Sequence, residues 1–241
     1  MTATVIDGRQ IAQEVRAEVA RDVREFQDRY QVTPGLAAVL IGDDPASASY
    51  VRSKEMACKE VGIFTETFSL SHKALQSDVL DLIHELNQDA RFHGILTQLP
   101  FPSQIHDATI IRSIDPTKDV DGLHPHNMGL LALGAPIFVP ATPLGVQQIL
   151  LRTGHDPAGR HVVVCGRSNI VGRPLAMLLS QKLDGANATV TVCHTGTSSM
   201  EKFTRQADIL ITAMGSPGII KADMVKQGAV VMDVGLSRVE D

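Results

Sequence analysis

The chain has 241 residues, of which 44% are hydrophobic, and a formal net charge of −5 at pH 7. This length is enough for one large domain or two small ones, since domains usually span roughly 100–200 residues. The excess of acidic residues argues against a protein that binds nucleic acid or a membrane surface, because such proteins carry basic patches. No apolar run approaches the roughly 18 residues that a membrane-spanning helix needs.

The first half of the chain alternates helical and strand patterns. Helices are expected where apolar residues recur every three or four positions, and buried strands where a short run is almost wholly apolar. Ser77 is the expected N-cap of the third helix. The order α-β-α-β-α-β predicts a parallel sheet with crossover helices. The predicted helices cover residues 11–30, 46–62 and 77–86, and the predicted strands that can be bounded cover residues 36–42 and 93–100.

The second half repeats this alternation, and four strands alternating with helices predict a doubly wound sheet. Between the halves, the Pro- and Gly-rich segment GAPIFVPATPLG indicates a domain boundary near Pro140. We therefore expect an α/β protein of two lobes, residues 1–140 and 141–241. The predicted strands of the second lobe cover residues 161–165, 188–193, 208–214 and 229–235, and its helices cover residues 174–183 and lie near 199–206 and 221–226.

The stretch VVVCGRSNIVGRPLA, residues 162–176, joins the first strand of this second sheet to its helix. Glycines are common in such turns, so the pattern alone is a weak signal for a nucleotide, and the usual G-x-G-x-x-G is missing. However, the start of a helix after the first strand of a doubly wound sheet offers free N–H groups to a phosphate. Arg167 and Ser168 add a cation and a hydroxyl, which favours a dinucleotide site.

The next strand of the second lobe ends in Cys193-His194-Thr195-Gly196-Thr197. Enzymes that use NAD commonly place an acid at this position to bind the ribose hydroxyls. Because no acid is present and Arg167 is expected nearby, the sequence favours NADP over NAD.

Candidate site residues in the first lobe are weaker signals when taken alone. Tyr50 and Lys54 share a helix face, although such a pair is more often a solvated lysine beside a half-buried tyrosine. Gln98 ends a buried strand, where ligand crevices of parallel sheets lie. His124 and His126 are two residues apart with no supporting cysteines, so we expect no metal site.

The three cysteines, Cys58, Cys165 and Cys193, are far apart in the sequence. No C-x-x-C motif occurs among them, so we expect all three to be reduced and buried. Together with an N-terminus that does not read as a secretory signal, this predicts a cytoplasmic protein.

Taken together, seven segments resemble the bifunctional methylenetetrahydrofolate dehydrogenase/methenyltetrahydrofolate cyclohydrolase family, in the family's order and over nearly the whole chain. They are SYVRSKEMACKEVGI, GILTQLPFP, DPTKDVDGLHP, PATPLG, VVVCGRSNIVGRPLA, ADILITAMGSPG and VVMDVG. The resemblance implies NADP-dependent oxidation of 5,10-methylenetetrahydrofolate and hydrolysis of the product to 10-formyltetrahydrofolate. It also implies a folate-binding first lobe, an NADP-binding second lobe and a homodimer.

The resemblance assigns roles in the first lobe to four residues. Lys54 resembles the family's catalytic lysine, which would act as general acid and base. Tyr50 resembles its helix partner that contacts the folate, and Gln98 the glutamine that hydrogen-bonds the lysine and the substrate. Asp121, in KDVDG, resembles the acid that binds the pterin ring.

In the second lobe, Gly166, Arg167 and Ser168 resemble the phosphate loop for the cofactor. Thr195 and Leu236 fall where the family makes further cofactor contacts.

The chain departs from the family pattern at several positions. Met56 stands where many members carry a second basic residue, and Ala141 replaces a frequent cysteine. Thr97 and Phe101 vary the segment around Gln98. Family members continue past the position that matches Asp241, so we expect this chain to hold folate poorly.

Two other functions remain open on the residues alone. One is another two-lobed dehydrogenase, acting on hydroxy or amino acids, which would need an acid–base residue at the site of hydride transfer. The other is a non-catalytic module that binds NADP. Only the folate enzyme would give a folate-dependent absorbance change with NADP.

Overall fold

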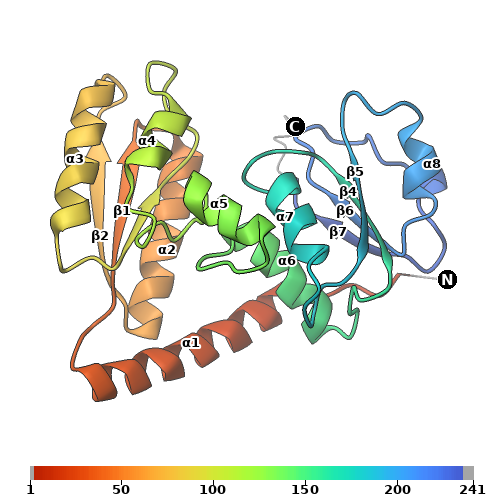
Figure 1. Cartoon of the computed structure of the whole chain (residues 1–241), viewed down its shortest axis with the longest axis horizontal. Coiled ribbons are helices and arrows are strands. Elements are labelled where there is room, and N and C mark those ends of the chain that lie inside the picture. Colours follow the sequence, from red (N-terminus) through yellow and green to blue (C-terminus); the bar gives the residue numbers. More distant parts are fainter. Residues whose placement is uncertain (1–2, 236–241) are drawn as a thin grey trace. The chain divides into compact units, whose positions relative to one another are not determined.

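The computed structural model describes residues 3–235, and the chain divides into two compact units, Met1–His126 and Asn127–Asp241. Each unit is built on its own parallel β-sheet with helices on both faces (Figure 1). The predicted α/β class is confirmed. Within the described part of the chain, no helix combines the length and the apolar character needed to cross a membrane.

The first unit contains a three-stranded sheet in the order β2-β1-β3. Helices α3 and α4 cover one face, with a core formed by alternate residues of β1, and α2 lies against the other face (Figure 1). The bounds of these elements and of α1 are α1 Gly8–Tyr30, β1 Gly35–Ile41, α2 Pro45–Val61, β2 Phe64–Leu70, α3 Gln76–Gln88, β3 Gly94–Thr97 and α4 Asp107–Ser113. Helix α5, Pro125–Ala132, begins at the end of this unit and lies mostly in the second.

Local capping determines where α2, the helix that carries Tyr50 and Lys54, begins and ends. The side chain of Asp44 accepts a hydrogen bond from the backbone N–H of Ser47, and a proline occupies the start of the helix. Gly62 ends it with φ of 87°, a left-handed conformation that favours glycine. The sequence predicted this helix correctly because both signals are local.

Three details of the first unit differ from prediction. The strand expected over residues 93–100 covers only Gly94–Thr97. The expected cap at Ser77 is wrong: α3 begins at Gln76, and Asp78 accepts a hydrogen bond of 2.8 Å from the backbone N–H of Leu75. Strand β2 was required by the alternation but could not be bounded, because its residues are mostly only half-buried and include four polar side chains. An edge strand has this composition, since one side of it has no partner strand within residues 3–235.

The second unit contains a four-stranded parallel sheet in the order β5-β4-β6-β7. Helix α7 packs on one face and α8 on the other, as a doubly wound sheet requires. The order reverses between β4 and β6, so a crevice is expected at their carboxyl ends. The bounds are α6 Ala141–Arg152, β4 His161–Cys165, α7 Gly172–Leu179, β5 Thr189–Cys193, α8 Met200–Thr204, β6 Ile209–Thr212, η1 Ala222–Met224 and β7 Val230–Asp233.

Two predicted helices of the second unit are shorter than expected. The helix near 221–226 is a single 3₁₀ turn, η1, and α7 ends at Leu179 rather than at residue 183. A chain reversal follows α7, in which Gly185 has φ of 74°. The domain boundary near Pro140 stays a prediction. The two compact units divide after His126, so residues 127–140 group with the second unit.

Candidate active site and cofactor site

A lysine and a glutamine from different elements meet in the first unit. Lys54 lies on α2, and its Nζ donates a hydrogen bond of 3.0 Å to Oε1 of Gln98, which follows β3. The other end of the amide is also held, because Nε2 of Gln98 donates to the carbonyl of Leu99 at 2.8 Å. The glutamine oxygen is therefore oriented toward the lysine.

The loop that carries Asp121 is anchored to the same sheet. Nζ of Lys118 donates to the carbonyls of Leu86, at 3.1 Å, and Asp89, at 3.0 Å, at the end of α3. The carbonyl of Lys118 in turn accepts a hydrogen bond of 2.7 Å from the N–H of Ile95 in β3. These bonds hold the loop beside β3 and so bring Asp121 near Lys54.

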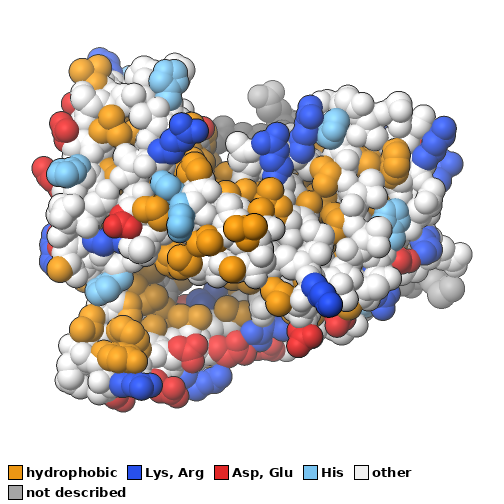
Figure 2. Space-filling model, viewed as in Figure 1, with side chains coloured by type: hydrophobic (Ala, Val, Ile, Leu, Met, Phe, Trp, Pro, Cys, Tyr) orange, Lys and Arg blue, Asp and Glu red, His pale blue; other side chains and the backbone are white. Residues whose placement is uncertain are grey.

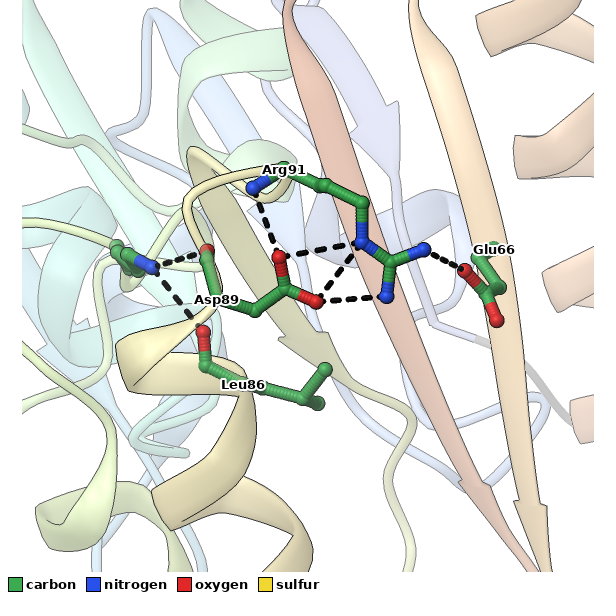
Figure 3. Close-up of polar contacts among 5 residues, drawn as sticks. Glu66, Leu86, Asp89 and Arg91 are labelled. Atoms are coloured by element: carbon green, nitrogen blue, oxygen red, sulfur yellow. Dashed lines mark hydrogen bonds and ion pairs between the residues drawn. The ribbon is translucent and has the colours of Figure 1, made fainter.

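In the turn between α3 and β3, Arg91 forms ion pairs with Asp89 and with Glu66 on β2. Its guanidinium lies 2.6 Å from Asp89 and 3.3 Å from Glu66 (Figure 3). These groups are exposed in part, so the ion pairs contribute little to stability. They do link the turn after α3 to the edge of the sheet.

Burial changes the protonation of the two central groups. Desolvation lowers the pKa of Lys54, and the nearby charge of Asp121 partly opposes this. Desolvation also raises the pKa of Asp121 to about 6, an effect that Lys54 opposes and the neighbouring Asp119 reinforces. Both shifts favour the neutral forms of the two groups. Both also bring the pKa values closer to neutral pH, where a group that can gain and lose a proton is useful in catalysis.

Tyr50, the other predicted site residue of the first unit, makes fewer contacts with the site. Tyr50 is 44% exposed, and among the described residues it makes no hydrogen bond to Lys54, Gln98 or Asp121. Asp119 was not singled out from the sequence, although it is almost fully buried and accepts a hydrogen bond from the N–H of His124. The only available signal was its place in the acidic segment KDVDG.

In the second unit, two glycines permit a close approach of backbone segments. Gly166 follows β4 with φ of 137°, and an added Cβ would lie 2.4 Å from the carbonyl oxygen of Ala213, after β6. An added Cβ on Gly172 would lie 2.1 Å from the carbonyl oxygen of Gly166. The turn is therefore tight, and it lies where the strand order reverses.

The polar groups of this turn suit a phosphate. Oγ of Ser168 accepts a hydrogen bond of 3.1 Å from the N–H of Val171, before α7, which leaves its O–H free to donate. Arg167 is exposed, and no other described residue pairs with its guanidinium. A helix N-terminus, a hydroxyl and an unpaired cation together fit an anionic ligand.

Strand β5 ends beside this turn. Cys193 is the register partner of Cys165, and its carbonyl accepts a hydrogen bond of 2.8 Å from the N–H of Gly166. Thr195, two residues further on, is exposed. The remaining predicted cofactor residue, Leu236, lies outside the described residues.

The structure also shows where the three cysteines lie and whether potential metal ligands form a cluster. Cys165 and Cys193 are buried and free, as predicted, but Cys58 is partly exposed, so the prediction of its burial is wrong. It lies on α2. In residues 3–235, no cluster of three or more His, Cys, Asp or Glu side chains could hold a metal ion.

Comparison with known proteins identifies one family over most of the chain. Residues 6–121 match the tetrahydrofolate dehydrogenase/cyclohydrolase catalytic domain, and residues 140–241 match the NAD(P)-binding domain of the same family. The Bifunctional protein FolD of Dehalococcoides mccartyi (strain CBDB1) is 52% identical over 98% of this chain and 79% of its own length.

Solved structures show the same similarity. The FolD methylenetetrahydrofolate dehydrogenase/cyclohydrolase of Campylobacter jejuni superposes with a TM-score of 0.93 at 42% identity, over 98% of this chain and 83% of that one. The Trypanosoma brucei N5,N10-methylenetetrahydrofolate dehydrogenase-cyclohydrolase, solved with NADP cofactor and inhibitor, gives 0.94 at 35% identity, over 100% and 82%.

Proposed function

This chain belongs to the tetrahydrofolate dehydrogenase/cyclohydrolase family, and we propose that it oxidises 5,10-methylenetetrahydrofolate with NADP and hydrolyses the methenyl product to 10-formyltetrahydrofolate. It is a bifunctional enzyme whose second unit is an NAD(P)-binding domain. The Lys54–Gln98 hydrogen bond is the observation that best supports folate chemistry in the first unit.

The two activities require different contributions from the protein: hydride transfer mainly requires alignment of two ligands, and hydrolysis requires proton transfer. When bound, NADP supplies the acceptor for the hydride, and the folate nitrogens stabilise the cation that remains. Hydrolysis of the methenyl bridge instead requires protons to move when water adds and the ring opens. Lys54 carries these protons on Nζ, which its lowered pKa makes suitable near neutral pH.

The neighbours of Lys54 position it and the substrate. Gln98 holds Nζ through Oε1. Asp121 accepts hydrogen bonds from the pterin ring, and Tyr50 offers an exposed ring for the folate to pack against. These roles follow from the family resemblance and are supported by the closeness of Lys54, Gln98 and Asp121.

The second unit binds NADP at the turn after β4. Gly166 and Gly172 let the pyrophosphate approach the backbone, Ser168 donates its hydroxyl, and Arg167 pairs with the 2′-phosphate. Thr195 adds a contact from the end of β5. The absence of an acid from residues 193–197 removes the repulsion that a 2′-phosphate would meet in an NAD enzyme.

A paired assay tests this function. The purified chain is mixed with NADP and 5,10-methylenetetrahydrofolate, and NADPH formation is followed; decay of methenyl absorbance is followed separately. We expect both reactions, and no NADPH with hydroxy or amino acids. NADPH formation from those acids would instead identify another dehydrogenase, and binding of NADP without either reaction would identify a binding module.

The active protein assembles as a homodimer in the cytoplasm. Support for a second copy comes from the edge of β2 and from exposed apolar side chains at the carboxyl end of α1 (Figure 2, lower left), including Tyr30, which is 53% exposed. Light scattering should give the mass of two chains, and Tyr30→Lys should weaken the association. A monomer at all concentrations would contradict it.

A further inference from the structure

The end of β5 contains a histidine to which neither the comparisons nor the family resemblance assigns a role. His194 follows Cys193 directly, at the place where an NAD enzyme has the acid that binds ribose. We propose that His194 is a specificity-determining residue of the cofactor site, whose Nε2–H donates to the 2′-phosphate of NADP. This proposal rests on the function proposed above and adds a residue to it.

His194 and the phosphate turn leave the sheet from adjacent points. Cys165 and Cys193 are register partners in neighbouring parallel strands, and the N–H of Gly166 donates to the carbonyl of Cys193. Pairing therefore continues for one residue beyond the named strands. Arg167 and His194 both emerge at this edge, so one anionic group placed there is within reach of both elements.

The turn after β5 holds the imidazole in one orientation. The backbone N–H of Gly196 donates to Nδ1 of His194 at 3.0 Å. The turn is closed by two further bonds, from His194 N to Oγ1 of Thr197 at 2.9 Å and from Thr197 N to the carbonyl of His194 at 2.8 Å. Gly196 is packed close, since an added Cβ would lie 3.2 Å from Cε1 of the ring.

This orientation determines which nitrogen can meet a ligand. Because Nδ1 accepts a hydrogen bond, the proton of the neutral ring is on Nε2. Nε2 has no hydrogen-bond partner among residues 3–235, and the side chain is only half-buried. A donor that is already oriented loses little freedom on binding, so it can favour a phosphate.

The expected consequence is selectivity between cofactors rather than general affinity. NAD has a hydroxyl where NADP has a phosphate, and a hydrogen bond to a charged group is stronger than one to a neutral group. Loss of the imidazole should therefore weaken NADP and leave NAD almost unchanged. An aspartate at the same position should weaken NADP further, because it would repel the phosphate.

Titrations on the full chain test this, using NADP, NAD, and the fragments adenosine 2′,5′-bisphosphate and adenosine 5′-phosphate. His194→Ala should weaken NADP and the bisphosphate by about 10-fold, and His194→Asp by more, with little change for the other two ligands. His194→Gln, whose amide can still donate, should recover part of the loss. Thr189→Ser, at the exposed first residue of β5 and away from this turn, is the matched control and should bind like the parent.

Equal losses for phosphorylated and unphosphorylated ligands in His194→Ala would overturn the proposal, since they would indicate a structural role. So would unchanged binding of all four, or no recovery in His194→Gln. Thermal unfolding of each variant shows whether it is folded, and the Gln variant serves if the Ala variant is not. Failure of the parent to bind NADP at all would instead contradict the proposed function.

Discussion

Nζ of Lys54 and Oε1 of Gln98 lie 3.0 Å apart, although 44 residues separate them in the chain. The amide group of Gln98 cannot rotate freely, because its nitrogen is bound to the carbonyl of Leu99. The lysine is thus held by a neutral acceptor. A neutral acceptor orients the ammonium group without adding a negative charge beside it. Burial lowers the pKa of Lys54, and the charge of Asp121 partly opposes this shift.

Replacing Lys54 should separate the two activities. Lys54→Gln keeps much of the length and polarity of the side chain but cannot exchange a proton near neutral pH. Cyclohydrolase turnover should fall by about 10²–10⁴-fold, the range of general acid–base catalysis. Dehydrogenase turnover should fall much less, because that step mainly needs alignment.

The control for Lys54→Gln is Lys59→Gln, which changes an exposed lysine of the same helix. NADPH formation and methenyl decay are measured for both variants. Methenyl hydrolysis at the parental rate in Lys54→Gln would show that Lys54 is not the proton carrier. Loss of both activities with folate binding retained would show that it positions the substrate for both steps.

Gln98→Glu should move the pH dependence of the cyclohydrolase upward. A carboxylate beside Nζ favours the charged lysine, so the pKa of Lys54 rises and the neutral amine is lost at neutral pH. Turnover at pH 7 should drop and recover partly in more basic buffer. Gln104→Glu is a control elsewhere in the first unit, and an unchanged pH profile in Gln98→Glu would argue against proton transfer through Lys54.

Asp121→Asn should stabilise the fold while it weakens folate binding. The pKa of Asp121 is raised from 3.8 to about 6, so the folded state binds this proton more tightly than the unfolded state. Between these two pH values the unfolding free energy contributed by Asp121 falls as pH rises. Above about pH 6 the carboxyl is ionised in the folded state, and the full loss of stability from burying its charge is present. Removing the charge should stabilise the chain at pH 7 by about 1–3 kcal/mol.

Urea unfolding of the parent and of Asp121→Asn, at pH 4 and pH 7, measures this difference. It should be small at the lower pH and larger at the higher one. Asp22→Asn, at an exposed position of α1, should show no such dependence. Equal stabilities of parent and Asp121→Asn at pH 7 would mean that the carboxylate is not penalised by burial.

Arg167→Ala should weaken NADP by about 1.5–3 kcal/mol, the size of a hydrogen bond to a charged group. NAD should bind nearly as before, because it has no 2′-phosphate. Arg173→Ala is the matched control, since that guanidinium is already bound to Asn169 at 2.8 Å. A titration that finds equal losses for both cofactors in Arg167→Ala would contradict the assignment.

Gly166→Ala should disrupt the cofactor site and destabilise the second unit. The new Cβ would need to occupy a position 2.4 Å from the carbonyl oxygen of Ala213, with the backbone at a positive φ. We expect loss of measurable NADP binding and a lower melting temperature. Gly145→Ala, inside α6 with open space around it, should instead be neutral or stabilising by up to about 1 kcal/mol. Parental NADP affinity in Gly166→Ala would be inconsistent with the close approach of the two turns.

The sequence by itself determined those features that depend on neighbouring residues. Strand β4 was predicted at its observed bounds because Val162, Val163 and Val164 form a short, β-branched apolar run, which is typical of a buried strand. The end of α2 at Gly62 followed from glycine's tolerance of a left-handed conformation. The tight turn between β4 and α7 followed from glycines between a strand and a helix, and its binding of a phosphate through Arg167 and Ser168 stays a prediction.

Only the tertiary structure decided features that depend on residues far apart in the chain. Strand β2 has no strong local signal, and its pairing with β1 places it at the edge of the sheet. The raised pKa of Asp121 depends on burial and on Lys54, which a linear pattern cannot reveal. In the same way Gly166 needs to be glycine because Ala213, 47 positions away, directly follows the neighbouring strand β6 and brings its carbonyl against the turn. The protonation of a side chain and the space around a backbone position both depend on residues that folding brings together from distant parts of the chain. A local sequence pattern therefore predicts them only in part.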